Sequence, residues 1–277
     1  MRGGRDGFIV VAVLAVLALL TSLVGALGLA VRGEIDAAST AREQIRLDGL
    51  TQAAVALVAY ELYMLKRPAH RVDGREIRLD DGIVLVRVED EAGKVDLNGA
   101  EPALLAGLYR AAGLEGLNPD VFAAEVVAWR QRLPAEMGAN DKREPGFRSI
   151  NELGWLPGLS SADVAVLSNL VTVHNPSGKI APAGAPVTVL KALPGLAPQT
   201  LDAVLRLRDA PTGPRAEDLA ALLQPQHEFL STKSGRSFRL LLEATTRAQS
   251  RRKVRLTTVK AAAEHSLFYT STYEMIF

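Results

Sequence analysis

The sequence predicts an α+β protein, in which a long N-terminal helix precedes an antiparallel sheet and an inserted helical block. Three observations predict this class. Residues 8–67 follow an apolar and then an amphipathic helical pattern, and alternating apolar and polar residues lie at 75–99 and again at 237–260. The residues between these strand patterns are rich in Ala and Leu and are broken by Pro and Gly. We therefore expect one sheet whose halves come from either side of a helical insertion.

Composition permits a folded body and names no partner. The chain has 277 residues, of which 48% are hydrophobic, so it can build a core. Its net charge of +1 gives no overall field that attracts nucleic acid. It has no cysteine, which excludes disulfides, thiolate nucleophiles and cysteine-rich zinc sites.

The first element is an apolar segment at residues 8–31 that contains no charged residue. A helix needs about 20 apolar residues to cross the hydrocarbon core, whereas the apolar run of a cleaved signal has only about 7–15. Arg2 and Arg5 precede the segment and a mixed group of charges follows it, which favours a cytoplasmic N-terminus. The sequence predicts a single-pass anchor with the body outside the cytoplasm.

The helical pattern continues beyond this segment without a turn signal. Apolar residues recur at helical spacing from Ala37 to Leu62, and Pro68 ends the pattern because the residue before proline disfavours the helical region. We expect one long helix over residues 8–67, apolar in its first half and amphipathic in its second. The alternative is an anchor followed by a separate core helix.

The strands follow the helix. Asp81-Gly82 separates two alternating runs and predicts a two-residue hairpin turn, and Gly93 opens a third short extended piece. Strand patterns return at 237–246 and 253–260. Between the two halves, residues 150–170 align without a gap with residues 187–207, and both copies contain the letters LPGL.

This repeat predicts two helix-hairpin-helix-like units. In each copy a proline and a glycine end one helix and reverse the chain before the next helix begins. The turn residues are Pro157, Gly158, Pro194 and Gly195.

Catalytic and metal motifs are missing from the sequence. The histidines are far apart, and there is no nucleophile elbow, phosphate loop or dinucleotide-binding glycine pattern, so we expect no enzyme activity. Carboxylates gather at Glu89, Asp90, Glu91 and Asp96, without the register of a calcium loop, and we expect solvated turn residues there.

The paired hairpins also raise a nucleic-acid alternative. Helix-hairpin-helix modules bind backbone phosphates through turn amides and usually carry a second glycine, where this chain has Ser160 and Ala197. The second hairpin supplies only Arg206 and Arg208 as cations. The favoured interpretation therefore includes no nucleic acid, and the alternative is a membrane-anchored extracytoplasmic DNA-binding protein of the competence type.

The order of segments resembles the minor pseudopilin K family of type II secretion, also called general secretion pathway protein K. The resemblance rests on segments that read EDEAGKVDLN, AAEVVAW, FRSINELGWLPGL and GKIAPAGAPVTVLKALPGL. It implies a pilin-like fold with an inserted α-domain. The regions are a leader at 1–7, a transmembrane and assembly helix at 8–67, a sheet region at 68–99 and 225–277, and the inserted domain at 100–224.

The resemblance also implies processing and a position in an assembly. A prepilin peptidase would cut between Gly7 and Phe8 and methylate the new terminus. Ala12 then stands at the fifth mature position, where most pseudopilins carry a glutamate that pairs with the subunit ahead, so its absence suits a tip subunit. The implied partners are minor pseudopilins I and J, the pseudopilus and the inner membrane, with the body in the periplasm. The implied role is structural, in the export of folded proteins.

The resemblance also implies calcium in the body. Relatives carry acidic residues after a DW pair, whereas this chain has Arg130 and Gln131 after Trp129. Only Asp141 and Glu144 remain as candidate calcium ligands, and we expect no required cofactor.

Overall fold

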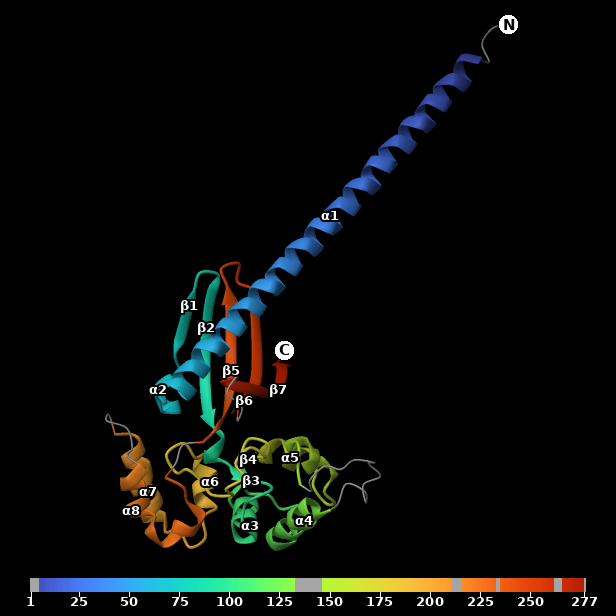
Figure 1. Cartoon of the computed structure of the whole chain (residues 1–277). Helices are drawn as coiled ribbons and strands as arrows, with labels where there is room; N and C mark the ends of the chain where they lie inside the picture. The colour runs from blue at the N-terminus through green and yellow to red at the C-terminus, as the bar shows by residue number, and fades with distance from the viewer. Residues whose placement is uncertain (1–4, 133–145, 211–215, 233–234, 262–265, 277) are drawn as a thin grey trace.

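A computed structural model describes residues 5–132, 146–210, 216–232, 235–261 and 266–276; side chains are not described at 5–11, 26–33, 35–36 and 216. Figure 1 shows a long helix that leads down to a sheet, and a helical domain beyond the far end of that sheet. Helix α1 (Arg5–Ala59) has 55 residues and continues into the π-helical turn η1 (Tyr60–Met64). The helix is continuous, so the alternative of a separate second helix is wrong. Pro68 then precedes the short α2 (Ala69–Val72).

The main sheet is antiparallel, with the strand order β1-β2-β5-β6-β7. Its strands are β1 (Glu76–Leu79), β2 (Gly82–Asp90), β5 (Ser237–Thr246), β6 (Arg251–Lys260) and β7 (Phe268–Ile276). Strand β2 from before the insertion pairs with β5 from after it. The predicted α+β class with an antiparallel sheet is confirmed.

Two details of the sheet differ from the prediction. Leu79 pairs with Gly82, so the hairpin loop is Asp80-Asp81 and not Asp81-Gly82. Gly82 is glycine for another reason, because a Cβ there would overlap the carbonyl oxygen of Thr245 on β5. Strand β7 was not predicted. Its side chains are mostly exposed on both faces, so its sequence has no alternation of buried and exposed residues by which a strand is recognised.

One hydrophobic core joins the second half of α1 to one face of the sheet. The helix contributes Leu50, Ala54 and Val58, and the sheet contributes the alternate residues of β2, β5 and β6 that point toward it. On β2 the buried residues recur at every second position, as the period of a half-buried strand requires. The packing fixes α1 against the sheet as far up as Leu47.

A second core lies in the inserted domain. It is built by α3 (Pro102–Ala111), α4 (Pro119–Gln131), α5 (Ser161–Leu167), α6 (Val187–Lys191), α7 (Pro198–Arg208) and α8 (Ala216–Leu222), with the 3₁₀ helices η2 (Glu91–Gly93), η4 (Ile150–Trp155) and η5 (Gln224–Phe229) beside them. The third extended piece does not join the main sheet. It forms β3 (Val95–Asp96), which pairs in parallel with β4 (Val171–Thr172), and Val95 and Leu97 are fully buried in the second core.

The two repeat copies share a turn but differ in their first helix. Gly158 has φ +83° and Gly195 has φ +68°, conformations that favour glycine. The second copy is a pair of α-helices, α6 and α7, whereas the first begins with the 3₁₀ helix η4. The expectation of two helix-hairpin-helix repeats is therefore not confirmed.

Candidate functional site

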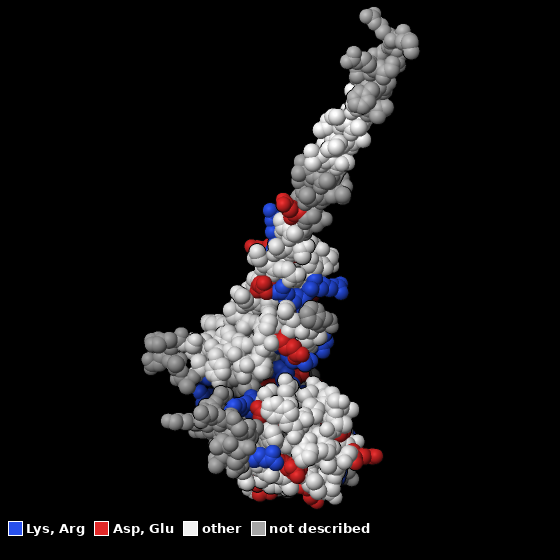
Figure 2. Space-filling view, turned by 90° about the vertical axis from the view of Figure 1, so that its right-hand side faces the viewer, with Lys and Arg blue, Asp and Glu red and all other residues white. Residues whose placement is uncertain are grey.

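The first candidate surface is the first part of α1, residues 5–33, which projects from the body (Figure 1). We call it the shaft. Its large apolar residues between 12 and 25 are all exposed, and the other residues of this stretch are small and uncharged. The large ones are Val13, Leu14, Val16, Leu17, Leu19, Leu20, Leu23 and Val24. In Figure 2 the described side chains of this shaft are uncharged, and charges first gather closer to the sheet. A helix that is apolar on all sides needs a lipid or protein cover.

The sequence-predicted processing and assembly residues lie at the start of this shaft. Ala12 is an exposed residue of α1. Gly7 and Phe8 belong to the helical backbone, but the Phe8 side chain is not among those that the structure describes. Nowhere in the described part of the chain is a helix both long and apolar enough to cross a membrane.

The candidate calcium ligands Asp141 and Glu144 lie outside the described residues. Among the residues that are described, no group of three or more His, Asp or Glu side chains is placed to hold a metal ion.

The second candidate site is the junction between the sheet and the inserted domain. The acidic run that we expected to be solvated is largely buried there: Glu91 and Asp96 are 0% exposed, and Asp90 is 9% exposed. That expectation was wrong, because these carboxylates are covered by nearby cations and backbone amides together with groups that are remote in sequence, such as Arg239 and the Asn175 amide.

The central ion network joins Glu91 to two cations. The Lys94 ammonium, 2% exposed, lies 3.0 Å from Glu91 Oε1 and 2.7 Å from Glu89 Oε2. Arg239 on β5 places its Nε 3.0 Å from the same Glu91 oxygen. Burial by itself would raise the pKa of Glu91, but Lys94 and Arg239 hold this pKa below its ordinary value. The network links the segment that leads from β2 into the inserted domain to β5, the strand that follows that domain.

Two aspartates complete the junction. Asp96 accepts backbone N–H bonds from Asn98, Gly99 and Asn175, each at 2.8 Å. Burial raises the pKa of Asp96, and these donors oppose the change. Asp90 accepts from Ala92 N at 2.9 Å.

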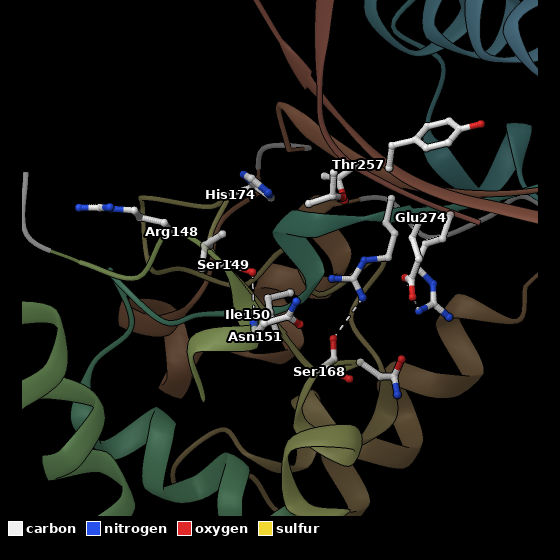
Figure 3. Close-up of a pocket in the computed structure, with 14 residues that line it drawn as sticks. Arg148, Ser149, Ile150, Asn151, Ser168, His174, Thr257 and Glu274 are labelled. Atoms are coloured by element: carbon white, nitrogen blue, oxygen red, sulfur yellow. Dashed lines mark hydrogen bonds and ion pairs between the residues drawn. The ribbon is translucent and has the colours of Figure 1, made fainter. Parts of the chain in front are cut away.

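A polar cavity of about 480 Å³ opens beside this network, between the inserted domain and the sheet face opposite α1. We call it the junction pocket. In Figure 3, Arg148, Ser149, Ile150, Asn151 and Ser168 lie on its helical side, and Thr257 and Glu274 lie on its sheet side. The remaining lining residues are Asn169, Val173, His174, Arg239, Arg255, Thr272 and Tyr273.

His174 reaches this pocket from the loop after β4. Its Nε2 lies 3.3 Å from Ser271 Oγ on β7. Burial lowers the pKa of His174, with the Arg239 charge acting in the same direction, although Glu91 and Asp96 oppose them. The imidazole is therefore neutral at pH 7.

A third surface is a groove of about 340 Å³ between α1 and β7. Thr51, Val55 and Ala56 form part of its helical wall, and Leu256, Phe268 and Tyr273 form part of its sheet wall. We call it the α1/β7 groove. It lies beside the edge strand of the main sheet.

A solved structure has a similar fold over most of this chain. It is described as the crystal structure of the GspK-GspI-GspJ complex from the enterotoxigenic Escherichia coli type 2 secretion system. The match has a TM-score of 0.60 and 16% sequence identity, and it covers 86% of this chain and 98% of the matched chain. The chain has a GspK-like minor pseudopilin fold. No family model and no curated protein matches the sequence.

The comparisons give no support to the DNA-binding alternative, and the second hairpin offers little to a phosphate. Arg208 is half-buried and its Nη1 donates to Ala185 O at 2.6 Å, so this guanidinium is already bonded within the fold. Ala197 stands where a phosphate-binding turn needs its second glycine.

The sequence did not indicate the junction pocket. His174, Arg239, Arg255 and Glu274 are spread over more than a hundred residues, and only the β5–β6–β7 register and the return of the inserted domain bring them together.

Proposed function

We propose that this protein is a minor pseudopilin of a type II secretion system that occupies the tip of the periplasmic pseudopilus. The observation that carries the proposal is the shaft, whose described side chains at 12–25 are uncharged and exposed, attached to a body with a GspK-like fold. Such a shaft serves to pack against lipid and then against the helices of other pseudopilins. The protein then acts in the export of folded proteins as a structural part and catalyses no reaction.

The shaft begins at a leader junction. In this proposal a prepilin peptidase cuts between Gly7 and Phe8 and methylates Phe8. Before assembly the apolar residues 8–31 cross the inner membrane once, and the body lies in the periplasm. The charge-free sequence of this segment supports the assignment.

Ala12 supports the tip position. A carboxylate in an apolar environment is costly unless a partner charge neutralises it. For a subunit inside the assembly, the subunit ahead of it can supply this partner charge. The first subunit has no neighbour ahead and therefore no partner charge. An exposed alanine at this position avoids an unpaired charge at the end of the assembly.

The proposed partners are minor pseudopilins of the I and J types. The matched solved structure is itself a GspK-GspI-GspJ complex, and this chain has two surfaces for such contacts, the apolar shaft and the α1/β7 groove. Calcium bound by Asp141 and Glu144 stays a prediction, which a calcium titration of the full chain followed by calorimetry tests.

Processing is tested by mass spectrometry of the protein purified from membranes of a host that carries the prepilin peptidase. We expect a terminus of N-methylated Phe8. The control is Gly7→Asp, which should block cleavage and retain Met1. A wild-type protein that keeps Met1 in the presence of an active peptidase would contradict the proposed function.

Assembly is tested separately by co-purification of the full chain with I-type and J-type pseudopilins. We expect a complex with the wild-type chain, and a weaker one when an exposed apolar side chain of the α1/β7 wall is replaced, as in Tyr273→Lys. A chain that binds neither partner would contradict the assignment of partners.

A further inference from the structure

We propose that the side of α1 and η1 that faces away from the sheet binds the N-terminal helix of one neighbouring minor pseudopilin, with Gly49 at the closest approach of the two helices. This face consists of residues at steps of three or four, and we call it the outer stripe: Ile45, Gly49, Ala53, Leu57, Tyr60 and Met64. None of these described residues lines the α1/β7 groove, so the stripe is a separate surface. The identity of the partner rests on the proposed function, whereas the docking face follows from the contacts of α1.

The outer stripe is apolar and exposed. Ile45 and Met64 are 70% and 58% exposed, and Leu57 and Tyr60 are 46% and 50% exposed. A helix that packs on a sheet by one side normally presents polar side chains to water on its other side, and α1 packs on the sheet in this way (Figure 1). Exposed apolar side chains at helical spacing instead mark a surface on which another protein element docks.

The charges beside the outer stripe are already engaged within the chain. A charged partner surface would therefore meet no counter-charge along the stripe and would lose its hydration there, so an apolar partner fits better. The charged residues of α1 and η1 between positions 45 and 64 form these ion pairs: Arg46 with Glu43, Asp48 with Arg252, and Glu61 with Arg67 and Arg75.

Lipid does not cover the outer stripe. The charge-free segment that the proposed function places in the membrane ends at residue 31, and Arg32, Glu34 and Asp36 follow it. Helix α1 continues without a break from this segment to Gly49. At about 1.5 Å per residue, the distance from residue 31 to residue 49 is about 27 Å. The stripe therefore lies in water beyond the membrane, where only protein can cover it.

Gly49 indicates that the cover includes the backbone of another helix. Glycine destabilises a helix interior relative to alanine. The fold of this chain does not require glycine here, because no atom of the described residues lies within 4 Å of the position that a Cβ would occupy. Gly107 in α3 is the contrasting case, since its Cβ would stand 2.1 Å from Ala192 O, where α3 and α6 touch. By the same geometry, a helix of another subunit passes over Gly49.

The shape of the outer stripe fits a helix that continues from the shaft. Gly49 and Ala53 form a low stretch between Ile45 on one side and Leu57 and Tyr60 on the other. The backbone of a helix can lie in this low stretch while its larger side chains pack against the residues that border it. A pseudopilin helix that packs on the shaft reaches the stripe without a change of direction, because α1 is one continuous helix.

Photo-cross-linking identifies the occupant. The full chain is produced with I-type and J-type pseudopilins in membranes, with p-benzoylphenylalanine in place of Tyr60. We expect an adduct whose mass equals this chain plus one pseudopilin. The same probe in place of Val121, an exposed residue of α4, should give no such adduct. An adduct with a second copy of this chain, no adduct from position 60, or equal capture from position 121 would each overturn the proposal.

Gly49→Leu tests the close approach. Fluorescence anisotropy measures binding of the cross-linked pseudopilin, purified and labelled, to the full-length chain in detergent micelles. We expect Gly49→Leu to weaken binding at least about tenfold, because its side chain fills the space of the partner backbone. Gly49→Ala favours the helix and should still weaken binding about threefold. The matched control is Gly154→Leu, also in open space but in the inserted domain, which should change affinity less than about twofold. Unchanged binding by Gly49→Leu would overturn the proposal, and circular dichroism verifies that each variant is folded.

The outer stripe and the proposed function can fail separately. A wild-type chain that binds no pseudopilin contradicts the partner assignment itself. If the wild-type chain binds, and binding survives Gly49→Leu but is lost in Tyr273→Lys, the partner lies in the α1/β7 groove. That result would overturn the outer stripe alone and leave the proposed function in place.

Discussion

Replacement of Glu91 by glutamine is the most informative perturbation of the domain junction. Glu91 Oε1 lies 3.0 Å from both Lys94 Nζ and Arg239 Nε, and the side chain has no exposed surface. At an effective dielectric constant of about 20, each contact corresponds to roughly 5 kcal/mol of Coulomb energy. Glutamine keeps the shape but loses both attractions and leaves the buried Lys94 with one exposed partner. Because the variant also avoids the desolvation of a carboxylate, we expect a net loss of about 3–5 kcal/mol.

Glu89→Gln is the matched control. It also removes a carboxylate from Lys94 Nζ, at the shorter distance of 2.7 Å, but the Glu89 side chain is 61% exposed. Solvent screening limits an exposed contact to about 1 kcal/mol or less. The same substitution with the same lysine partner should therefore have a much smaller effect on stability.

Urea unfolding of the full chain in detergent can measure both variants. The two tryptophans, Trp129 and Trp155, lie in the inserted domain, so their fluorescence follows that domain, whereas far-ultraviolet circular dichroism follows the whole chain. We expect Glu91→Gln to lower the midpoint by both probes. If Glu91→Gln costs no more than Glu89→Gln, burial is not what makes this network strong and the reasoning is refuted.

Three further predictions concern packing, the repeat turn and pH. Gly107→Ala should cost about 1–3 kcal/mol or more, because its Cβ would overlap Ala192 O where α3 and α6 touch; a variant of wild-type stability in urea would show that the helices can separate freely. Gly158→Ala should cost about 1–3 kcal/mol, since φ is +83° and the Cβ would meet Leu117. Gly154→Ala, with open space around it, should be nearly neutral. Thermal melts in which Gly154→Ala lowers the melting temperature more than Gly158→Ala would contradict this. Because the pKa of His174 is lowered in the folded state, its protonation favours unfolding, so stability should fall as pH drops below about 6.5. His174→Gln should flatten the melting temperature between pH 7.5 and 5.5, and an unchanged slope would exclude His174 as its source.

Local patterns were sufficient to predict the elements that bury one face. The alternation of β2 and the periodicity of α1 are direct consequences of a shared core, and both appear in the structure. Strand β7 has no buried face, so it carried no period to detect. The misplaced hairpin turn has a similar cause: Gly82 resembles a turn glycine, but β5 requires it, and β5 lies more than 150 residues later in the sequence.

The same contrast between local patterns and remote contacts applies to the candidate sites. The projecting apolar helix could be predicted because its property is continuous in sequence. The junction could not, because Thr172 and Arg239, two of the groups that interact with the buried Glu91 carboxylate, lie far from it in the sequence. Charged residues look solvated in a sequence whenever their partners are remote, and only the fold shows which of them are paired.

The contacts at the junction also explain how an inserted domain can transmit force to the sheet. An insertion connects to its host through two chain segments, and flexible crossings would let the domains move independently. Here Asp90 bonds to both connecting segments. Its Oδ1 accepts from Ala92 N at 2.9 Å in the segment that leaves β2, and its Oδ2 accepts from Gly235 N at 3.1 Å in the segment that returns to β5. The Glu91–Arg239 pair repeats this connection one residue further on. A load on the inserted domain therefore reaches β2 and β5 together, and these are two adjacent inner strands on which the second half of α1 packs.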